Sequence, residues 1–150
     1  MKILHTSDWH LGHTLYNFDR TEEQTAMLAQ IIDIVREEKP DAFLLSGDVY
    51  HTSQPSAAVQ TMFTDAIVQI HEANPAMTIV ITAGNHDSGT KHEIFKTPWQ
   101  ALKVFSVGNI DKEHPENHIT ASWAITFSLS TLPIFLSRIF SLSAICWTGM

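Results

Sequence analysis

The chain has 150 residues, 44% of them hydrophobic, and a chain of this length buries one core as a single domain. Its 16 Asp and Glu residues outnumber its 9 Lys and Arg residues, which gives a formal net charge of -7. This balance excludes a protein that binds nucleic acid by positive charge alone, because phosphate contacts require Lys and Arg. It does not exclude a metal-dependent enzyme, because bound divalent ions reverse the local sign of charge.

The cysteine content and the amino terminus bear on the cellular compartment. Cys146 is the only cysteine of the chain, so an intrachain disulfide is excluded and a reducing compartment is favoured. The apolar run at residues 1–6 is too short for a signal peptide. We therefore expect a cytoplasmic protein.

Short apolar runs alternate along the chain with segments of helical periodicity. Three runs have the continuous apolar character of strands buried on both faces: residues 2–6, 42–45 and 77–83. The two segments between them repeat apolar residues at helical spacing, over about 21–39 and 56–71. The order β-α-β-α-β predicts a parallel sheet. A further helix starting at Thr97 and a strand at 104–107 are expected to follow.

Several single residues carry local expectations. Thr21 and Gln24 match a capping box, in which the two side chains satisfy free backbone N–H groups at the start of a helix. His5, inside the first strand, is expected to be a buried core residue. His92 is expected at the surface, and Arg20 in a surface ion pair.

Metal-binding residue types follow each of the three predicted strands. The three segments are Ser7-Asp8-Trp9-His10-Leu11-Gly12, Gly47-Asp48-Val49-Tyr50-His51 and Gly84-Asn85-His86-Asp87. Each segment alone is also compatible with an ordinary turn. Together they indicate one site, because ligands bind beyond the carboxyl ends of the strands in open parallel sheets. Carboxylate, amide and imidazole groups without a thiolate favour Mn²⁺ or a similar ion over structural zinc.

These three segments, with the flanking Trp9, Tyr50 and Ser88, resemble the calcineurin-like metallophosphoesterases, and within that family a group of DNA nuclease subunits. The resemblance covers residues 1–118. It implies the α/β/β/α sandwich of the family, of which this α/β chain supplies the first βαβαβ half. It also implies a Mn²⁺-dependent nuclease of DNA repair and recombination, acting as an exonuclease on double-stranded DNA and an endonuclease on single-stranded or hairpin DNA. In this truncated chain we expect that activity to be impaired. The implied partners are DNA and an ATPase subunit. Formation of a homodimer stays open beside them, and no membrane association is expected.

The resemblance implies a role for each candidate site residue. It assigns ligands for two divalent ions: Asp8 and His10 on the first, Asp48 bridging both, and Asn85 on the second. It places His86 at the scissile phosphate, which this histidine would orient or whose leaving oxygen it would protonate. His51 would be a secondary contact. Two ions about 3.5–4 Å apart activate a water and clamp the attacking and leaving oxygens.

One part of the family pattern is missing from this sequence. The family's site also takes a histidine from a later strand and two from a Gly-His-x-His segment, and the sequence has no such segment. His114 and His118 occur at the wrong place in the order and are expected to be solvated. The first metal would therefore lack one protein ligand and the second would lack two. Two alternatives to the nuclease stay open: another phosphatase or phosphodiesterase of the superfamily, and a catalytically silent fragment.

The composition changes abruptly toward the carboxyl terminus. The last thirty residues contain no Asp, Glu, Lys or His, and Arg138 is their only charge. We expect residues 119–150 to form an apolar tail, for which three interpretations compete. They are a non-native carboxyl terminus, a strand at 125–130, and a membrane segment, which requires about 20 mostly apolar residues. Pro133 and many hydroxyl side chains weaken the last interpretation.

Overall fold

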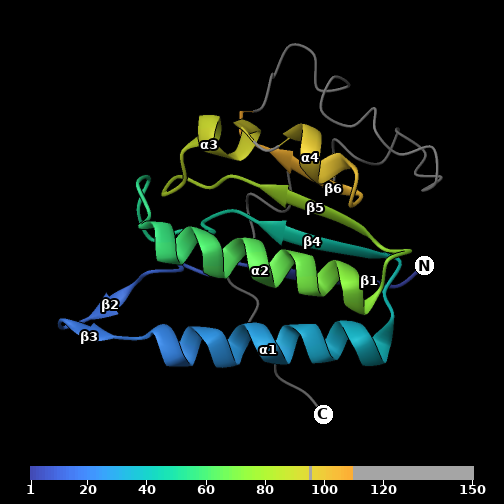
Figure 1. Cartoon of the computed structure of the whole chain (residues 1–150), viewed down its shortest axis with the longest axis horizontal. Coiled ribbons are helices and arrows are strands. Elements are labelled where there is room, and N and C mark those ends of the chain that lie inside the picture. The colour runs from blue at the N-terminus through green and yellow to red at the C-terminus, as the bar shows by residue number, and fades with distance from the viewer. Residues whose placement is uncertain (95, 110–150) are drawn as a thin grey trace. The chain divides into compact units, whose positions relative to one another are not determined.

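The computed structural model describes residues 1–94 and 96–109 (Figure 1). The expected domain boundary near residue 118 and the apolar tail at 119–150 lie outside the described residues. The same is true of His114 and His118.

Four parallel strands form the central sheet, in the order β1-β4-β5-β6. They are β1 Ile3–Ser7, β4 Ala42–Ser46, β5 Thr78–Thr82 and β6 Val104–Val107. The predicted parallel sheet is thus confirmed, with strand ends shifted by about one residue. Ser7, Ser46 and Thr82 lie in register across the first three strands. Because these strands end level with one another, the three segments that follow them emerge side by side.

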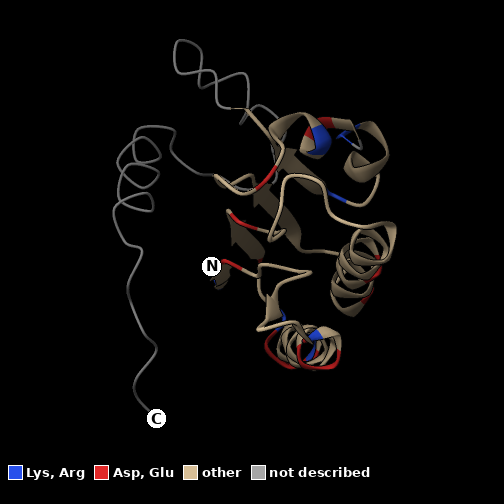
Figure 2. Cartoon of the chain, turned by 90° about the vertical axis from the view of Figure 1, so that its left-hand side faces the viewer, with Lys and Arg blue, Asp and Glu red and all other residues tan. Residues whose placement is uncertain are grey.

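Two long helices cover one face of the sheet, and Figure 2 shows them end-on. They are α1 Thr21–Glu38 and α2 Ala57–Ala73, and two shorter helices follow: α3 Gly89–Ile94 and α4 Lys96–Gln100. The core between α1, α2 and the sheet consists of apolar side chains that are fully or almost fully buried, including Leu28, Ile32, Val35, Phe43, Leu45, Phe63, Ile67, Ile79 and Ile81. Helix α3 is not apparent from the sequence pattern. Among the helices of the described chain, none has both the length and the apolar character needed to cross a membrane.

His5 is exposed on the opposite face of the sheet, whereas a buried core residue was expected. Strand β1 is at the end of the sheet, and its outward-facing residues Ile3, His5 and Ser7 are exposed. The ring nitrogen Nε2 of His5 lies 2.9 Å from the hydroxyl of Ser46. The expectation of a buried His5 was therefore wrong, because among the described elements the long helices cover only the other face of this strand.

The start of α1 also differs from the capping-box prediction. Arg20 occupies the N-cap position without a side-chain cap, and the carboxylate of Asp19 instead accepts hydrogen bonds from the backbone N–H and hydroxyl of Thr21 (2.8 and 2.6 Å). Asp19 ends a short hairpin, β2 Thr14–Leu15 and β3 Phe18–Asp19, which the apolar pattern does not reveal. Tyr16 and Asn17 form its two-residue turn with positive φ, as tight hairpins require.

Candidate metal centre

Side chains of the first segment point alternately into the hydrophobic core and toward the candidate metal centre. Trp9 is 5% exposed and packs edge-on against Phe43 and Phe63, with ring centroids 6.3 Å apart in each pair. Its indole N–H donates to the hydroxyl of Thr6 (3.0 Å). Because Trp9 is anchored in the core, its neighbours Asp8 and His10 lie at the carboxyl edge of the sheet.

The first and second segments remain paired beyond the strands. The backbone N–H of Asp8 donates to the carbonyl of Gly47 (3.2 Å), and that of His10 to the carbonyl of Asp48 (2.9 Å). The N–H of His51 returns a bond to the carbonyl of Leu11 (3.0 Å). This pairing places His10 beside Asp48, with Nε2 of the imidazole 3.9 Å from the carboxylate.

Gln24 supports the first segment from helix α1. Its side chain is 7% exposed; its amide oxygen accepts from the N–H of Gly12, and its amide nitrogen donates to the carbonyl of His10, both at 3.1 Å. The residue that the sequence indicated as a helix cap therefore holds the loop that carries Asp8 and His10.

Three candidate metal ligands have a backbone conformation that L-residues rarely adopt. The φ angles are +57° for Asp8, +45° for His10 and +45° for Asp48. Such conformations cost of order 1–3 kcal/mol each and persist only where the surrounding structure enforces them. They concentrate at functional sites, so this clustering on three neighbouring candidate ligands supports a binding role for the loops.

The third segment is bound to the second through side chains. The backbone N–H of His86 donates to Asp48 Oδ1 (2.9 Å). A Cβ atom on Gly84 would lie 2.2 Å from the same carboxylate oxygen and 2.3 Å from the Asp48 backbone nitrogen. Only glycine permits this approach. Asn85, between Gly84 and His86, has an exposed side chain.

Asp87 is the structural centre of this arrangement, and no sequence pattern indicated a role for it. Its carboxylate accepts hydrogen bonds from three backbone N–H groups, those of Val49 (3.0 Å), Tyr50 (2.9 Å) and Gly84 (2.9 Å). Burial raises the pKa of Asp87, but the nearby His92 imidazole and the hydrogen bonds from these three N–H groups outweigh it and lower the pKa below its ordinary value. The carboxylate therefore stays ionised and ties the second segment to the third.

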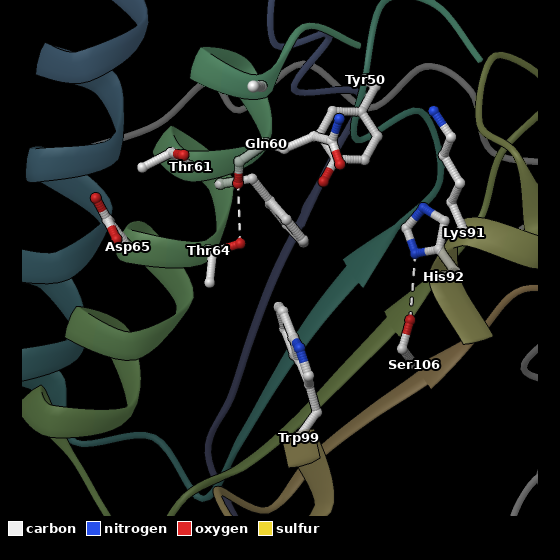
Figure 3. Close-up of a pocket in the computed structure, with 11 residues that line it drawn as sticks. Tyr50, Gln60, Thr61, Thr64, Asp65, Lys91, His92, Trp99 and Ser106 are labelled. Carbon is white, nitrogen blue, oxygen red and sulfur yellow. Dashed lines mark hydrogen bonds between the residues drawn. The ribbon is translucent and has the colours of Figure 1, made fainter. Parts of the chain in front are cut away.

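His92 supports Asp87 from helix α3, and the expectation of a surface residue was wrong. Its side chain is 3% exposed, with Nε2 3.6 Å from Asp87 Oδ2. Its Nδ1 lies 3.2 Å from the hydroxyl of Ser106, as Figure 3 shows. It is buried because α3 packs against β6. His92 and Ser106 also line a cavity of about 390 Å³ between α2, α3 and α4, which none of the candidate metal ligands lines.

Two sets of side chains at the strand ends fit a metal ion. One oxygen or nitrogen atom from each of Asp8, His10 and Asp48 lies within 4.8 Å of the others. The same limit holds for one nitrogen from each of His10, His51 and His86. The structure thus brings together five of the six predicted site residues, and Asn85 lies in the adjoining turn.

The imidazole rings form a larger cluster than the sequence indicated. The ring centroids of His10 and His86 are 5.0 Å apart. The ring centroid of His13, a residue outside the three segments, lies 4.4 Å from that of His51. Burial and the neighbouring imidazoles together lower the pKa of His51. Only its position directly after the first segment could have indicated from the sequence that His13 joins this cluster.

A cavity of about 570 Å³ adjoins the carboxylate set. Asp8, His10, His13, Arg20 and His51 are among its lining residues. Arg20 forms the expected surface ion pair, with Nε 2.6 Å from a carboxylate oxygen of Glu23. Asp8 and His10 therefore face an open space large enough for a phosphate group.

Comparison with known proteins agrees with this geometry. Residues 1–141 match the family model of the calcineurin-like phosphoesterases. The SbcD component of the nuclease SbcCD from Rhodobacter capsulatus is 38% identical over 112 residues, which are 75% of this chain and 28% of that protein. The SbcD proteins of Bacillus subtilis and Escherichia coli are 39% and 36% identical over 88 residues, 59% of this chain and 22% of each relative.

The matched segment spans less than a third of each of these relatives. The family match, by contrast, extends over most of the chain, and the described part has the parallel sheet and strand-end carboxylate and imidazole groups that a metal-dependent phosphoesterase requires. The chain therefore belongs to the calcineurin-like phosphoesterase family.

Proposed function

We propose that this chain is the metal-binding part of an SbcD-like, Mn²⁺-dependent DNA nuclease subunit that acts in DNA repair and recombination. The observation that carries the proposal is the convergence of Asp8, His10 and Asp48 at the ends of two adjacent parallel strands, in loops with enforced positive φ. The similarity to three SbcD proteins supports the choice of substrate.

The proposed metal sites follow the donor chemistry. Asp8, His10 and Asp48 would hold a first divalent ion, and Asp48 and Asn85 would hold a second. Carboxylate, amide and imidazole donors suit Mn²⁺. When bound, the two ions supply an activated water and neutralise charge on the phosphate oxygens. They also offset the acidic net charge of the chain, which by itself repels DNA.

His86 is proposed to act at the leaving oxygen, with His51 as its support. Nδ1 of His86 lies 2.9 Å from the backbone carbonyl of His51, and since a carbonyl only accepts, Nδ1 carries the proton. This bond leaves Nε2 to face the substrate, where it would donate a proton to the leaving oxygen. The His51 ring, 5.8 Å from the His86 ring and nearly parallel to it, would contact the phosphate beside it.

The proposed partners follow from the relatives. The similar proteins are named as components of the nuclease SbcCD, so we propose an SbcC-type ATPase as the partner of the whole protein. A homodimer is a second element of the proposal, and sedimentation of the full chain tests it. The single cysteine supports a reducing, cytoplasmic environment.

Mn²⁺ titration by calorimetry, followed by cleavage assays, tests the proposed function. The full chain should bind Mn²⁺ and the Asp48→Asn variant should not. The Mn²⁺-bound chain should cleave double-stranded DNA at a reduced rate, because three ligands of the family pattern are missing from its sequence. Hydrolysis of a small phosphoester without cleavage of DNA would replace the nuclease with a phosphatase. Absence of Mn²⁺ binding to the unmodified chain would refute the metal-dependent proposal altogether.

A further inference from the structure

The three imidazoles at the strand ends form a donor set distinct from the carboxylate set. His10, His51 and His86 come from three different loops, and one nitrogen of each lies within 4.8 Å of the others. The backbone N–H of each histidine donates a hydrogen bond to another loop. His10 donates to the carbonyl of Asp48 (2.9 Å), His51 to the carbonyl of Leu11 (3.0 Å) and His86 to the side-chain oxygen Oδ1 of Asp48 (2.9 Å). The cluster is therefore organised before any ion binds.

Nitrogen atoms of this cluster lack partners in the described part of the chain. Nδ1 of His10 and Nδ1 of His51 are shielded from solvent and make no hydrogen bond there. Buried polar atoms are normally paired, and each exception requires an explanation. His86 donates from Nδ1 to a carbonyl, so its Nε2 has a free lone pair whenever the ring is neutral. A cation shared by the three rings explains these unpaired atoms.

We propose that His10, His51 and His86 form a second cation site that takes a borderline transition ion such as Zn²⁺, and that occupation of this site excludes the ion held by Asp8 and Asp48. Three imidazoles with one open position match the ligand number of catalytic zinc sites. Zn–N bonds of about 2.0–2.1 Å place tetrahedral nitrogens roughly 3.3 Å apart, so side-chain rotations of about 1 Å close the cluster.

The exclusion follows from the shared ligand. His10 belongs to both sets, and a neutral imidazole has only one free lone pair, so it binds one ion at a time. The imidazole set favours Zn²⁺ over Mn²⁺, whereas the carboxylates favour the harder ion. Zn²⁺ would also occupy His86 and His51, so it acts as an inhibitor. The exclusion and its inhibitory consequence rest on the proposed function; binding of a cation to the three histidines does not.

Co²⁺ is the probe for the new site, because its visible absorption is intense in tetrahedral sites and weak in octahedral ones. The full chain should give the intense spectrum with Co²⁺, and Zn²⁺ should abolish it. His51→Asn should weaken Co²⁺ binding by at least about tenfold, since even groups that only orient a ligand contribute that much. His13→Asn, which removes the adjacent imidazole, should leave the spectrum unchanged. A weak spectrum, or equal losses in the two variants, would overturn the assignment.

Competition between ions tests exclusion separately. Zn²⁺ added to the Mn²⁺-loaded chain should release Mn²⁺, detected as the sharp EPR signal of the free ion, and simultaneous binding of both ions would refute exclusion. Asp8→Asn should lose Mn²⁺ binding and keep the intense Co²⁺ spectrum. If the unmodified chain binds Co²⁺ as described but no Mn²⁺, the proposed function fails while the three-histidine site stands.

Discussion

Replacement of Asp87 tests whether one buried carboxylate holds the metal-binding loops together. Asp87→Ala removes the acceptor of three backbone N–H groups, two of which belong to the buried residues Val49 and Tyr50. Each unsatisfied buried donor costs about 1–3 kcal/mol, so we expect a loss of about 3–5 kcal/mol in the free energy of unfolding. This is a large share of the roughly 5–15 kcal/mol available to a domain.

Asp87→Asn removes fewer hydrogen-bond acceptors than Asp87→Ala does. Asp87 Oδ2 accepts two N–H groups and Oδ1 accepts one. The amide oxygen keeps the pair at Oδ2, while the NH₂ group faces the N–H of Tyr50, so we expect a loss of about 1–3 kcal/mol. Because the pKa of Asp87 is lowered in the folded state, the native contribution is fully present above the unfolded pKa, about 3.9, and is lost as the pH falls through the folded value. The difference between native chain and variant should therefore shrink only in acid.

Urea unfolding followed by circular dichroism measures these losses, and calorimetry measures Mn²⁺ binding in the same variants. Asp33→Ala is the matched control, because Asp33 is an exposed carboxylate on α1 that forms only an i,i+3 ion pair with Arg36. Its effect should stay within about 0.5 kcal/mol. An Asp87→Ala variant as stable as this control, with unchanged Mn²⁺ affinity, would refute the role of Asp87.

Three further substitutions probe the loops individually. Asp8→Gly should unfold at higher urea than Asp8→Ala, by about 1–2 kcal/mol, because glycine tolerates the positive φ; both should lose Mn²⁺ binding, and equal stabilities would contradict backbone strain. Gly84→Ala places a Cβ 2.2 Å from Asp48 Oδ1, so we expect about 1–3 kcal/mol of destabilisation and weaker Mn²⁺ binding by calorimetry. Gln24→Ala leaves the N–H of Gly12 without its acceptor and should cost about 1–3 kcal/mol in urea unfolding; a neutral effect would exclude support of the first loop by α1.

The strands and long helices were predictable from sequence because their signals are local. Continuous apolar runs indicated β1, β4 and β5 to within about one residue, and helical spacing indicated α1 and α2. The level strand ends follow from parallel pairing, so the meeting of Asp8 and Asp48 was expected. Features that depend on short turns were not predicted. Tyr16 and Asn17, with positive φ, form the turn of the β2–β3 hairpin. This hairpin leads directly into α1, so the expected capping box does not form.

The tertiary structure alone decided which side chains support the site. Asp87 meets Val49 across 38 positions, His86 meets His51 across 35, and His92 meets Ser106 across 14. No periodicity links residues at such separations, so a buried carboxylate in a turn and a histidine on a short helix look like surface residues. The residues of metal-binding type occur in three short segments and can be recognised from the sequence. Their shared coordination space and the buried groups that hold it exist only once parallel pairing brings the loops together.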